Sequence, residues 1–448
     1  MKKFYDKAPI IIQNLMCSVA GFKINYQRYD KNFEQMLADY CARGSWSKEA
    51  LIKFRDYRIK SFVRHAYMTT VYYSTLFRKL RIKPDDIQSL EDLAHLPILT
   101  KSVVKENYDQ FISTAVSSSS VVMAHTSGTT GSGLIFPTTK HALHEQWAVW
   151  WRYRMQHGIS RQMWCGYFGG RPIVPIKQVR PPYWRINFPA KQIMYSAYHI
   201  NDDTIDAYVD DIVRRQLAWL HGYPSVLSLI AGRILQRDLT QDLNVSVVTT
   251  GAENLNEHQR HLISLAFDLQ PRQHYGLAEG VVNISENSDG YLCVDEDFSA
   301  VEFVDSDLGF TKDIVGTNYT NYAFPLIRYN TGDQVELSEH NISSARNVKS
   351  IHGRAEDYLV LNNGAKIGRL DHILKDAVCI SESQFTQDRA GHAVLKIVPA
   401  SSFTEKDENL LRQEIYNFLG DKISIDIVKV SKIQKTNAGK LKFVINRM

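Results

Sequence analysis

The chain has 448 residues, which exceeds the size at which a single hydrophobic core stops growing, so two or three domains are expected. Its 53 Lys and Arg residues against 48 Asp and Glu residues give a net charge of +5, which is too weak over this length to indicate nucleic-acid binding. The five cysteines lie far apart without a CxxC pair. This excludes a disulfide framework or a zinc knuckle and predicts a cytoplasmic protein with reduced thiols.

The N-terminal segment superficially resembles a signal peptide, because Lys2 and Lys3 precede an apolar run over residues 8–20. However, Gln13 and Asn14 interrupt that run, and no stretch of about 18 apolar residues occurs in the sequence. We therefore expect a helix that packs against the protein, a membrane surface or a partner.

Apolar periodicity predicts the next elements. Residues 27–98 have aromatic and aliphatic side chains at helical spacing, and Thr100 is expected to cap a further helix. A short apolar strand follows at 121–124, and a Trp-rich helix is expected over 140–155.

Between that strand and that helix lies a run of small and polar residues, from His125 to Gly133. Its three glycines permit positive φ angles and close approach, and its hydroxyls and free N–H groups can bind an anion such as a triphosphate. A flexible Ser/Gly surface loop is the alternative. The order strand, loop, helix favours a phosphate site.

Strands and helices also alternate in the second half of the chain. A buried strand at 246–250 is followed by a helix over 257–269, and a second strand ends near 276. After residue 356 the pattern indicates a small α+β unit, with a hairpin turn at 362–364 and a helix over 408–419.

Five separate motifs follow one another in order along the chain. They are Thr126–Gly131, Tyr275–Glu279, Tyr329–Asp333, Gly353–Asp357 and Lys435–Lys440. Together they resemble the adenylate-forming superfamily of acyl-CoA synthetases and peptide-synthetase adenylation domains, and within it the phenylacetate–CoA ligase and CapK-like capsule-biosynthesis branch. One such motif would be weak evidence, whereas an ordered set is strong.

The resemblance implies an α/β fold with a large multi-layer N-terminal AMP-binding domain over 1–356, helical over 1–98, and a small mobile α+β lid domain over 357–448. It implies an enzyme that uses ATP and Mg²⁺ to convert a carboxylic acid to acyl-AMP, with release of pyrophosphate. The acyl group would pass to a thiol, on coenzyme A or a carrier protein, or to an amine. The CapK-like context suggests capsule or surface polysaccharide biosynthesis, with peripheral association with a membrane or a polysaccharide-assembly complex.

The resemblance also assigns roles to individual residues. Lys440 would be the catalytic lysine, Glu279 a catalytic residue that binds Mg²⁺, and Asp357 the hinge. Tyr275 would stack on adenine and Asp333 would accept hydrogen bonds from the ribose. The full set of expected nucleotide-binding residues is Thr126, Ser127, Gly128, Thr129, Thr130, Gly131, Gly251, Ala252, Glu253, Tyr275, Gly276, Asp333 and Arg354.

The acyl pocket is expected among aromatic and glycine residues, although such clusters also form cores. The candidates are Tyr167, Phe168, Gly169, His221, Tyr223 and Gly276. An aromatic or otherwise flat acid would suit them.

Two departures from the family pattern bear on cofactors and mechanism. Ser132, Gly133 and Leu134 replace the usual Lys-Pro after the third glycine of the phosphate loop. The contacts of this loop with the γ-phosphate can therefore differ from those in relatives. Relatives often carry a structural zinc site between the second and third motifs, but here that interval holds Cys293 and no histidine, so no zinc is expected.

Two alternative functions stay open. One is a nucleotidyl transferase that stops at adenylation, and the other is a catalytically silent scaffold for polysaccharide assembly. The presence of Asp333, Arg354 and Lys440 argues against the scaffold.

Overall fold

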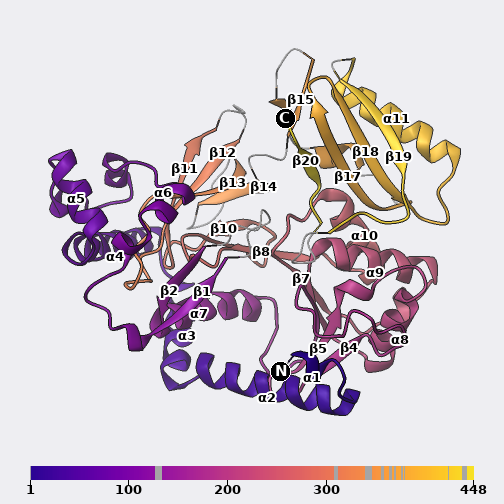
Figure 1. Cartoon of the computed structure of the whole chain (residues 1–448), viewed down its shortest axis with the longest axis horizontal. Helices are drawn as coiled ribbons and strands as arrows, with labels where there is room; N and C mark the ends of the chain where they lie inside the picture. The colour runs from indigo at the N-terminus through magenta and orange to yellow at the C-terminus, as the bar shows by residue number, and fades with distance from the viewer. Residues whose placement is uncertain are drawn as a thin grey trace. The chain divides into compact units, whose positions relative to one another are not determined.

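The computed structural model describes residues 2–126, 134–306, 311–338, 346–354, 358–362, 366–367, 370–374, 377, 379–421, 423–435 and 441–448. The expected site residues from Ser127 to Gly131, together with Asp357 and Lys440, lie outside these ranges. The chain divides into two compact units (Figure 1). Unit 1 comprises residues 1–25, 159–273 and 352–448, and unit 2 comprises residues 26–158 and 274–351.

The larger sheet of unit 1 is mostly parallel. Its strands, in spatial order, are β7 (Val247–Thr250), β6 (Trp219–Gly222), β3 (Cys165–Gly169), β5 (Gln192–Ser196) and the antiparallel edge strand β4 (Trp184–Asn187). Helices α8 (Ile205–Arg215), α9 (Pro224–Gln236) and α10 (Glu257–Phe267) contribute to its core. The predicted buried strand and the helix after it are confirmed as β7 and α10. This order puts the carboxyl ends of β3, β6 and β7 at one edge of the sheet.

The C-terminal part of unit 1 has a sheet and core of its own. The sheet order is β19 (Ser424–Lys429), β18 (His392–Pro399), β17 (Ile380–Arg389) and β20 (Val444–Asn446), and α11 (Glu405–Leu419) lies along it (Figure 1). A short hairpin of β15 (Leu359–Val360) and β16 (Lys366–Ile367) precedes it. The predicted α+β unit and hairpin are therefore confirmed.

Unit 2 combines helices with an antiparallel sheet. After α1 (Lys2–Tyr5) and α2 (Ile10–Arg28), the helices are α3 (Lys31–Arg43), α4 (Lys48–Thr69), α5 (Val71–Leu80), α6 (Lys101–Glu106) and α7 (Lys140–Gln156). The sheet order is β11 (Ala300–Asp305), β12 (Lys312–Thr317), β13 (Tyr329–Leu337), β14 (Asn347–Arg354), β10 (Leu292–Val294), β9 (Asn283–Glu286) and β8 (Arg272–Gly276). The predicted helical region and Trp-rich helix are confirmed, and Thr100 caps α6 through a hydrogen bond from the Val103 N–H.

The phosphate-loop region departs from the expected order of strand, loop and helix. Strand β1 (Val121–His125) pairs antiparallel with β2 (Ile135–Thr139), so a second strand lies between the loop sequence and α7. Thr126 N–H donates to the Leu134 carbonyl at 2.9 Å, and Leu134 N–H donates to Thr126 Oγ1 at 2.8 Å. The expected order was wrong because the apolar residues after the loop form β2, with Phe136 buried in the core. The loop therefore does not lead directly into a helix N-terminus.

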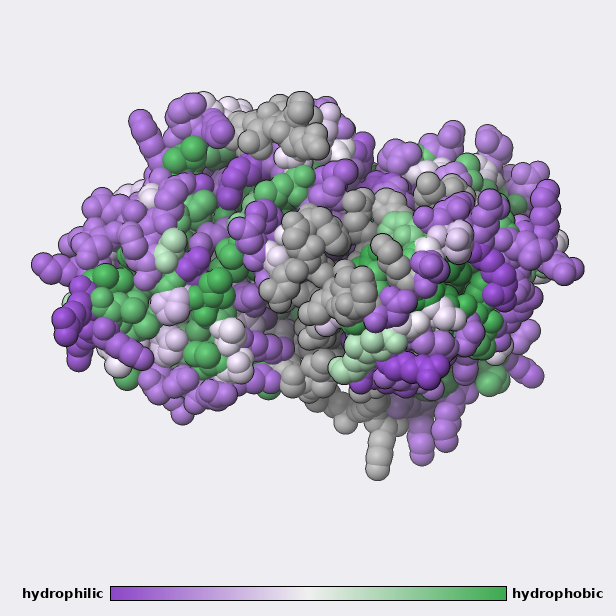
Figure 2. All heavy atoms as spheres, turned by 90° about the horizontal axis from the view of Figure 1, so that it is seen from above, coloured by the Kyte–Doolittle hydropathy of each residue, from purple (hydrophilic) through white to green (hydrophobic). Residues whose placement is uncertain are grey.

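In the part of the chain that the structure describes, every helix is too short or too polar to cross a bilayer. The surface seen in Figure 2 is predominantly hydrophilic, with apolar side chains in groups between polar ones.

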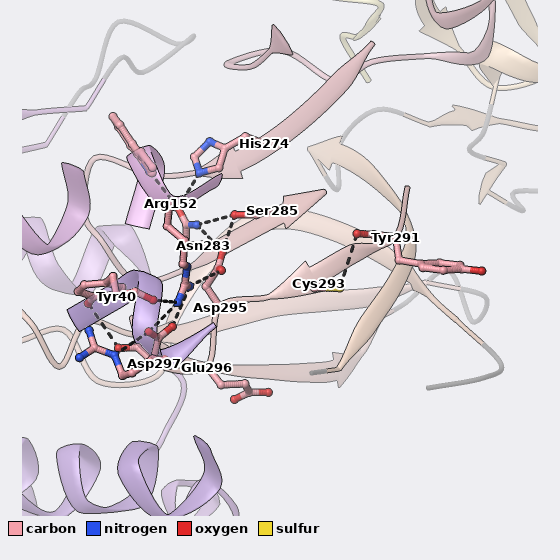
Figure 3. A network of polar contacts seen from close by, with 12 residues as sticks. Tyr40, Arg152, His274, Asn283, Ser285, Tyr291, Cys293, Asp295, Glu296 and Asp297 are labelled. Atoms are coloured by element: carbon pink, nitrogen blue, oxygen red, sulfur yellow. Dashed lines mark hydrogen bonds and ion pairs between the residues drawn. The ribbon is translucent and has the colours of Figure 1, made fainter. Parts of the chain in front are cut away.

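A buried ion-pair network joins the helices of unit 2 to its sheet (Figure 3). Arg152 of α7 donates to Asp295 at 2.7 Å and to Asp297 at 2.8 Å, and Arg43 of α3 also donates to Asp297 at 2.8 Å. Burial alone would raise the pKa of Asp297, but the two guanidinium groups hold that pKa below its usual value. Asp297 therefore stays ionised and requires its cationic partners.

Replacing Arg152 should destabilise unit 2. Arg152→Met leaves the buried Asp297 and the partly buried Asp295 without their shared cation, which should lower the free energy of unfolding by about 3 kcal/mol. Amide hydrogen exchange of α7 at increasing urea concentration measures this loss. The matched control is Arg214→Met, because Arg214 pairs with Asp211 but its side chain is 69% exposed, and it should change stability by about 0.5 kcal/mol or less. Equal losses for both variants would contradict the assignment.

Candidate active site

In unit 2, the structure brings together two side chains from separate motifs. Tyr275, at the end of β8, donates its hydroxyl hydrogen to Asp333 Oδ2 of β13 at 2.7 Å. Burial and the negative charge of Asp333 raise the pKa of Tyr275 well above its usual value, so the hydroxyl stays protonated and donates. The two residues expected to contact adenine and ribose therefore form a single hydrogen-bonded pair.

The backbone around Asp333 has a shape that depends on the preceding residues. Gly332 has φ of 75°, in the left-handed region that favours glycine. Its N–H donates to Asn330 Oδ1 at 2.8 Å, and the N–H of Asp333 donates to Thr331 Oγ1 at 3.1 Å. Thr331 Oγ1 in turn donates to the carbonyl of Ile314 on β12 at 3.0 Å. The Thr-Gly pair thus fixes the position of the carboxylate within the strand.

Glu279 lies just beyond β8 and is 6% exposed. Its carbonyl accepts a hydrogen bond from Asn318 Nδ2 at 3.0 Å, and the following Gly280 has φ of 67°. A buried carboxylate supplies the hard oxygen ligand that Mg²⁺ prefers, and this ion commonly uses one or two carboxylates together with substrate phosphates. The residue present therefore fits the expected ion.

Gly276 lies against polar side chains that the sequence did not point to. Asn283 Oδ1 accepts hydrogen bonds from Trp150 Nε1 at 2.9 Å and from His274 Nε2 at 2.8 Å. A Cβ at Gly276 would lie 2.9 Å from that same oxygen. Burial lowers the pKa of His274 to about 3, so its ring is neutral and Nε2 carries the donated hydrogen. Only glycine fits beside this arrangement without displacing it.

In unit 1, four residues of the predicted acyl pocket lie at or near the ends of parallel strands: Tyr167, Gly169, His221 and Tyr223. The rings of Tyr167 on β3 and His221 on β6 stack with centroids 5.6 Å apart. His221 Nδ1 is hydrogen-bonded to Thr249 Oγ1 of β7 at 2.8 Å. A Cβ at Gly169 would lie 2.3 Å from the Tyr167 ring, so the glycine allows that ring to lie against the strand end. Tyr223 follows β6, and burial raises the pKa of its hydroxyl.

Phe168 does not join these residues. Its side chain is fully buried in the core of unit 1, with its ring stacked on Tyr195 at 4.6 Å. Successive residues of a strand point to opposite faces, so Phe168 faces away from its neighbour Tyr167. It therefore supports the packing of the sheet.

Glu253, beyond the end of β7, contacts the C-terminal part of the same unit. Its Oε2 accepts the N–H of Ser225, in the first turn of α9, at 3.2 Å, and its Oε1 accepts the N–H of Leu441 at 2.8 Å. Burial raises the pKa of Glu253, against the opposing effects of these hydrogen bonds and the charge of Lys435. The preceding Ala252 has φ of 67°, which is strained for a residue with a side chain. Glu253 thus holds the residue that directly follows Lys440.

Comparisons with known proteins show what this chain is similar to. A family model for the CapK C-terminal domain matches residues 359–447. The chain is 27% identical over 456 residues to the protein CapK of Staphylococcus aureus, with 99% of each chain covered. This chain is therefore similar to CapK along almost its whole length. It is also 24% identical over 437 residues to a phenylacetate–coenzyme A ligase of Aromatoleum evansii, covering 90% of this chain and 95% of that one.

The fold of this chain is similar to that of a solved acyl-CoA ligase. The crystal structure of 2-hydroxyisobutyryl-CoA ligase in the postadenylation state, in complex with R3-HIB-AMP, superposes with a TM-score of 0.67. The two chains are 15% identical, and 88% of each is covered. The α/β fold class and the resemblance drawn from the five motifs are confirmed.

Several contacts around the candidate site residues could not be identified from motifs. Ser225 and Leu441 act through backbone N–H groups, which every residue except proline carries. Trp150, His274 and Asn283 come from different elements, α7, β8 and β9. Arg354 ends β14 as part of its predicted motif, and the structure describes its backbone alone.

The buried neutral His274 predicts a pH dependence of stability. Because its pKa falls from about 6.5 to about 3 on folding, the unfolded chain takes up a proton first. The contribution of His274 to the free energy of unfolding is therefore complete above pH 6.5 and is lost as the pH falls toward 3. The slope of unfolding free energy against pH, measured by urea unfolding, gives the number of protons that the chain takes up when it unfolds. In His274→Gln this number should be smaller by about one. The exposed His261 gives the control variant His261→Gln. An unchanged slope in His274→Gln would contradict the buried neutral ring.

Proposed function

We propose that this protein is an ATP-dependent adenylate-forming ligase. It activates a carboxylic acid as acyl-AMP with release of pyrophosphate, and passes the acyl group to the thiol of coenzyme A or a carrier protein, or to an amine. The observation that carries the proposal is the Tyr275–Asp333 pair.

The pair supports nucleoside binding because its two members offer different chemistry. A carboxylate has several acceptor sites, so Asp333 can accept from ribose hydroxyls as well as from Tyr275. The half-buried Tyr275 ring offers an aromatic face for the adenine base, and its hydrogen bond to Asp333 fixes its orientation. Adenine and ribose recognition would thereby be coupled.

Glu279 would hold the Mg²⁺ ion that accompanies ATP. The ion, when bound, neutralises negative charge on phosphate oxygens. Glu279 is 6% exposed, and its carboxylate offers the hard oxygen ligand that this ion prefers.

Lys440 would supply the charge that stabilises the transition state. Attack of the carboxylate on the α-phosphate develops negative charge, and a cation aimed at that charge lowers the barrier. Leu441, the next residue, is held by Glu253 beyond β7. This contact ties the end of the Lys435–Lys440 motif to the sheet that also carries Tyr167 and His221.

The substrate acid is proposed to be flat, because Tyr167 and His221 present stacked rings at neighbouring strand ends. The resemblance to the CapK-like capsule-biosynthesis branch, together with the match of residues 359–447 to the CapK C-terminal domain, supports a place in capsule or surface polysaccharide biosynthesis. In that setting the acceptor would be an amine as readily as a thiol.

Pyrophosphate exchange tests the proposed reaction. Incubation with ATP, Mg²⁺ and labelled pyrophosphate should give labelled ATP only when a suitable acid is present. The acid panel should include aromatic acids, amino acids and uronic acids. Exchange without an acceptor supports adenylation, and a final product that keeps AMP would instead indicate a nucleotidyl transferase. No exchange across the panel from a folded protein would favour the scaffold and overturn the proposal.

Lys440→Ala should reduce exchange by roughly 10²-fold or more, because a charge contact made in the transition state is lost. ATP binding, measured by calorimetry, should remain nearly unchanged. Lys432→Ala is the matched control, since Lys432 is an exposed lysine of the same segment. Equal exchange by the Lys440 variant and the wild type would remove this residue from the mechanism.

A further inference from the structure

Helix α2 packs with its polar side chains inward. Gln13 Oε1 accepts from Arg185 Nε at 2.6 Å, and Asn14 Oδ1 accepts from the Ile186 N–H at 3.0 Å. Ser18 Oγ donates to the carbonyl of Ile186 at 3.2 Å. Arg185 and Ile186 belong to β4, the edge strand of the unit 1 sheet, so these side chains satisfy an otherwise exposed strand edge.

The opposite face of α2 is apolar and exposed. Its outward side chains follow helical spacing and expose 60–80% of their surface: Ile11 80%, Leu15 60%, Val19 62% and Phe22 66%. A surface helix of a globular protein normally has the reverse arrangement. A continuous stripe of this kind marks an interaction surface.

A neighbouring loop of unit 1 extends the apolar surface. Tyr5 of α1 donates its hydroxyl hydrogen to the Ile173 carbonyl at 2.6 Å, which ties the N-terminal segment to this loop. Ile176 and Val179 in the loop expose 64% and 83% of their surface. A hollow of about 430 Å³, lined in part by Ile10 and Trp184, lies beside α2. The apolar area thus extends beyond a single helix face.

The charge around this surface is positive. The chain has no Asp or Glu between Glu145 and Asp202, and α2 carries none. Exposed cations flank the apolar side chains: Lys7, Lys23, Arg171, Lys177 and Arg180. Asp6 is the acidic residue of the N-terminal segment. Apolar side chains bordered by basic ones are the pattern of helices that lie in a membrane interface.

We propose that α2 and the loop around Ile176 dock the protein on the surface of an anionic membrane. The helix lies in the plane of the interface, with Leu15, Val19 and Phe22 inserted at the boundary of headgroups and acyl chains. The flanking Lys and Arg residues contact anionic headgroups. A second copy of the chain suits the surface less well, because a two-fold symmetric dimer would place the same cations of both copies close together, where they repel.

Vesicle sedimentation tests the proposal with the full chain. The protein should bind vesicles of phosphatidylcholine mixed with phosphatidylglycerol, bind pure phosphatidylcholine less, and dissociate as salt is raised. Leu15→Ser/Phe22→Ser should weaken binding about tenfold or more, because two apolar side chains no longer insert. Lys177→Glu/Arg180→Glu should remove most of the preference for anionic lipid.

The matched control is Leu410→Ser/Tyr416→Ser, which replaces exposed apolar side chains of α11 and should leave binding unchanged. Circular dichroism checks that each variant is folded. Failure of the wild type to bind mixed vesicles, or equal weakening in the control, would overturn the proposal. So would a wild-type dimer in light scattering that Leu15→Ser/Phe22→Ser converts to a monomer, because the surface would then be an interface between copies. None of these outcomes depends on the proposed adenylation.

Discussion

The carboxylate of Asp333 is the group on which the nucleotide side of the proposed site depends. It accepts the hydroxyl of Tyr275 and lies in a strand whose local shape requires Thr331 and Gly332. At the neighbouring Gly276, a side chain would collide with Asn283 Oδ1, which is held by a hydrogen bond from Trp150 Nε1. A change at any of these positions would alter how an adenine ring and a ribose could be held together.

The second constraint lies in unit 1, where Glu253 holds two backbone N–H groups from segments far apart in the chain. One belongs to the first turn of α9 and the other to the residue after Lys440. A carboxylate near a helix N-terminus is favourable, because the helix dipole places partial positive charge there. Glu253 therefore links the sheet that carries the proposed acyl pocket to the segment that carries the proposed catalytic lysine.

The sequence predicted the parts of this arrangement that depend on residue type. Tyr275, Glu279 and Asp333 could be proposed as site residues because their motifs occur in order, and their roles stay predictions. The strand β2 was missed because a short apolar run does not distinguish a strand from the start of a helix. The sequence also showed an apolar N-terminal segment, but only the packing of Gln13 and Asn14 on β4 showed which face of α2 is exposed. A contact made through a backbone N–H, such as that of Leu441, does not depend on residue type and cannot be predicted from the sequence.

Transfer of oxygen from the acid to the nucleotide tests the central claim most directly. The acid that supports exchange would be labelled with ¹⁸O in its carboxylate and incubated with ATP, Mg²⁺ and the acceptor, and the products analysed by mass spectrometry. Attack on the α-phosphate followed by acyl transfer leaves one labelled oxygen in AMP, and this is the result that we predict. Label in inorganic phosphate with formation of ADP would show attack on the γ-phosphate and would contradict the account.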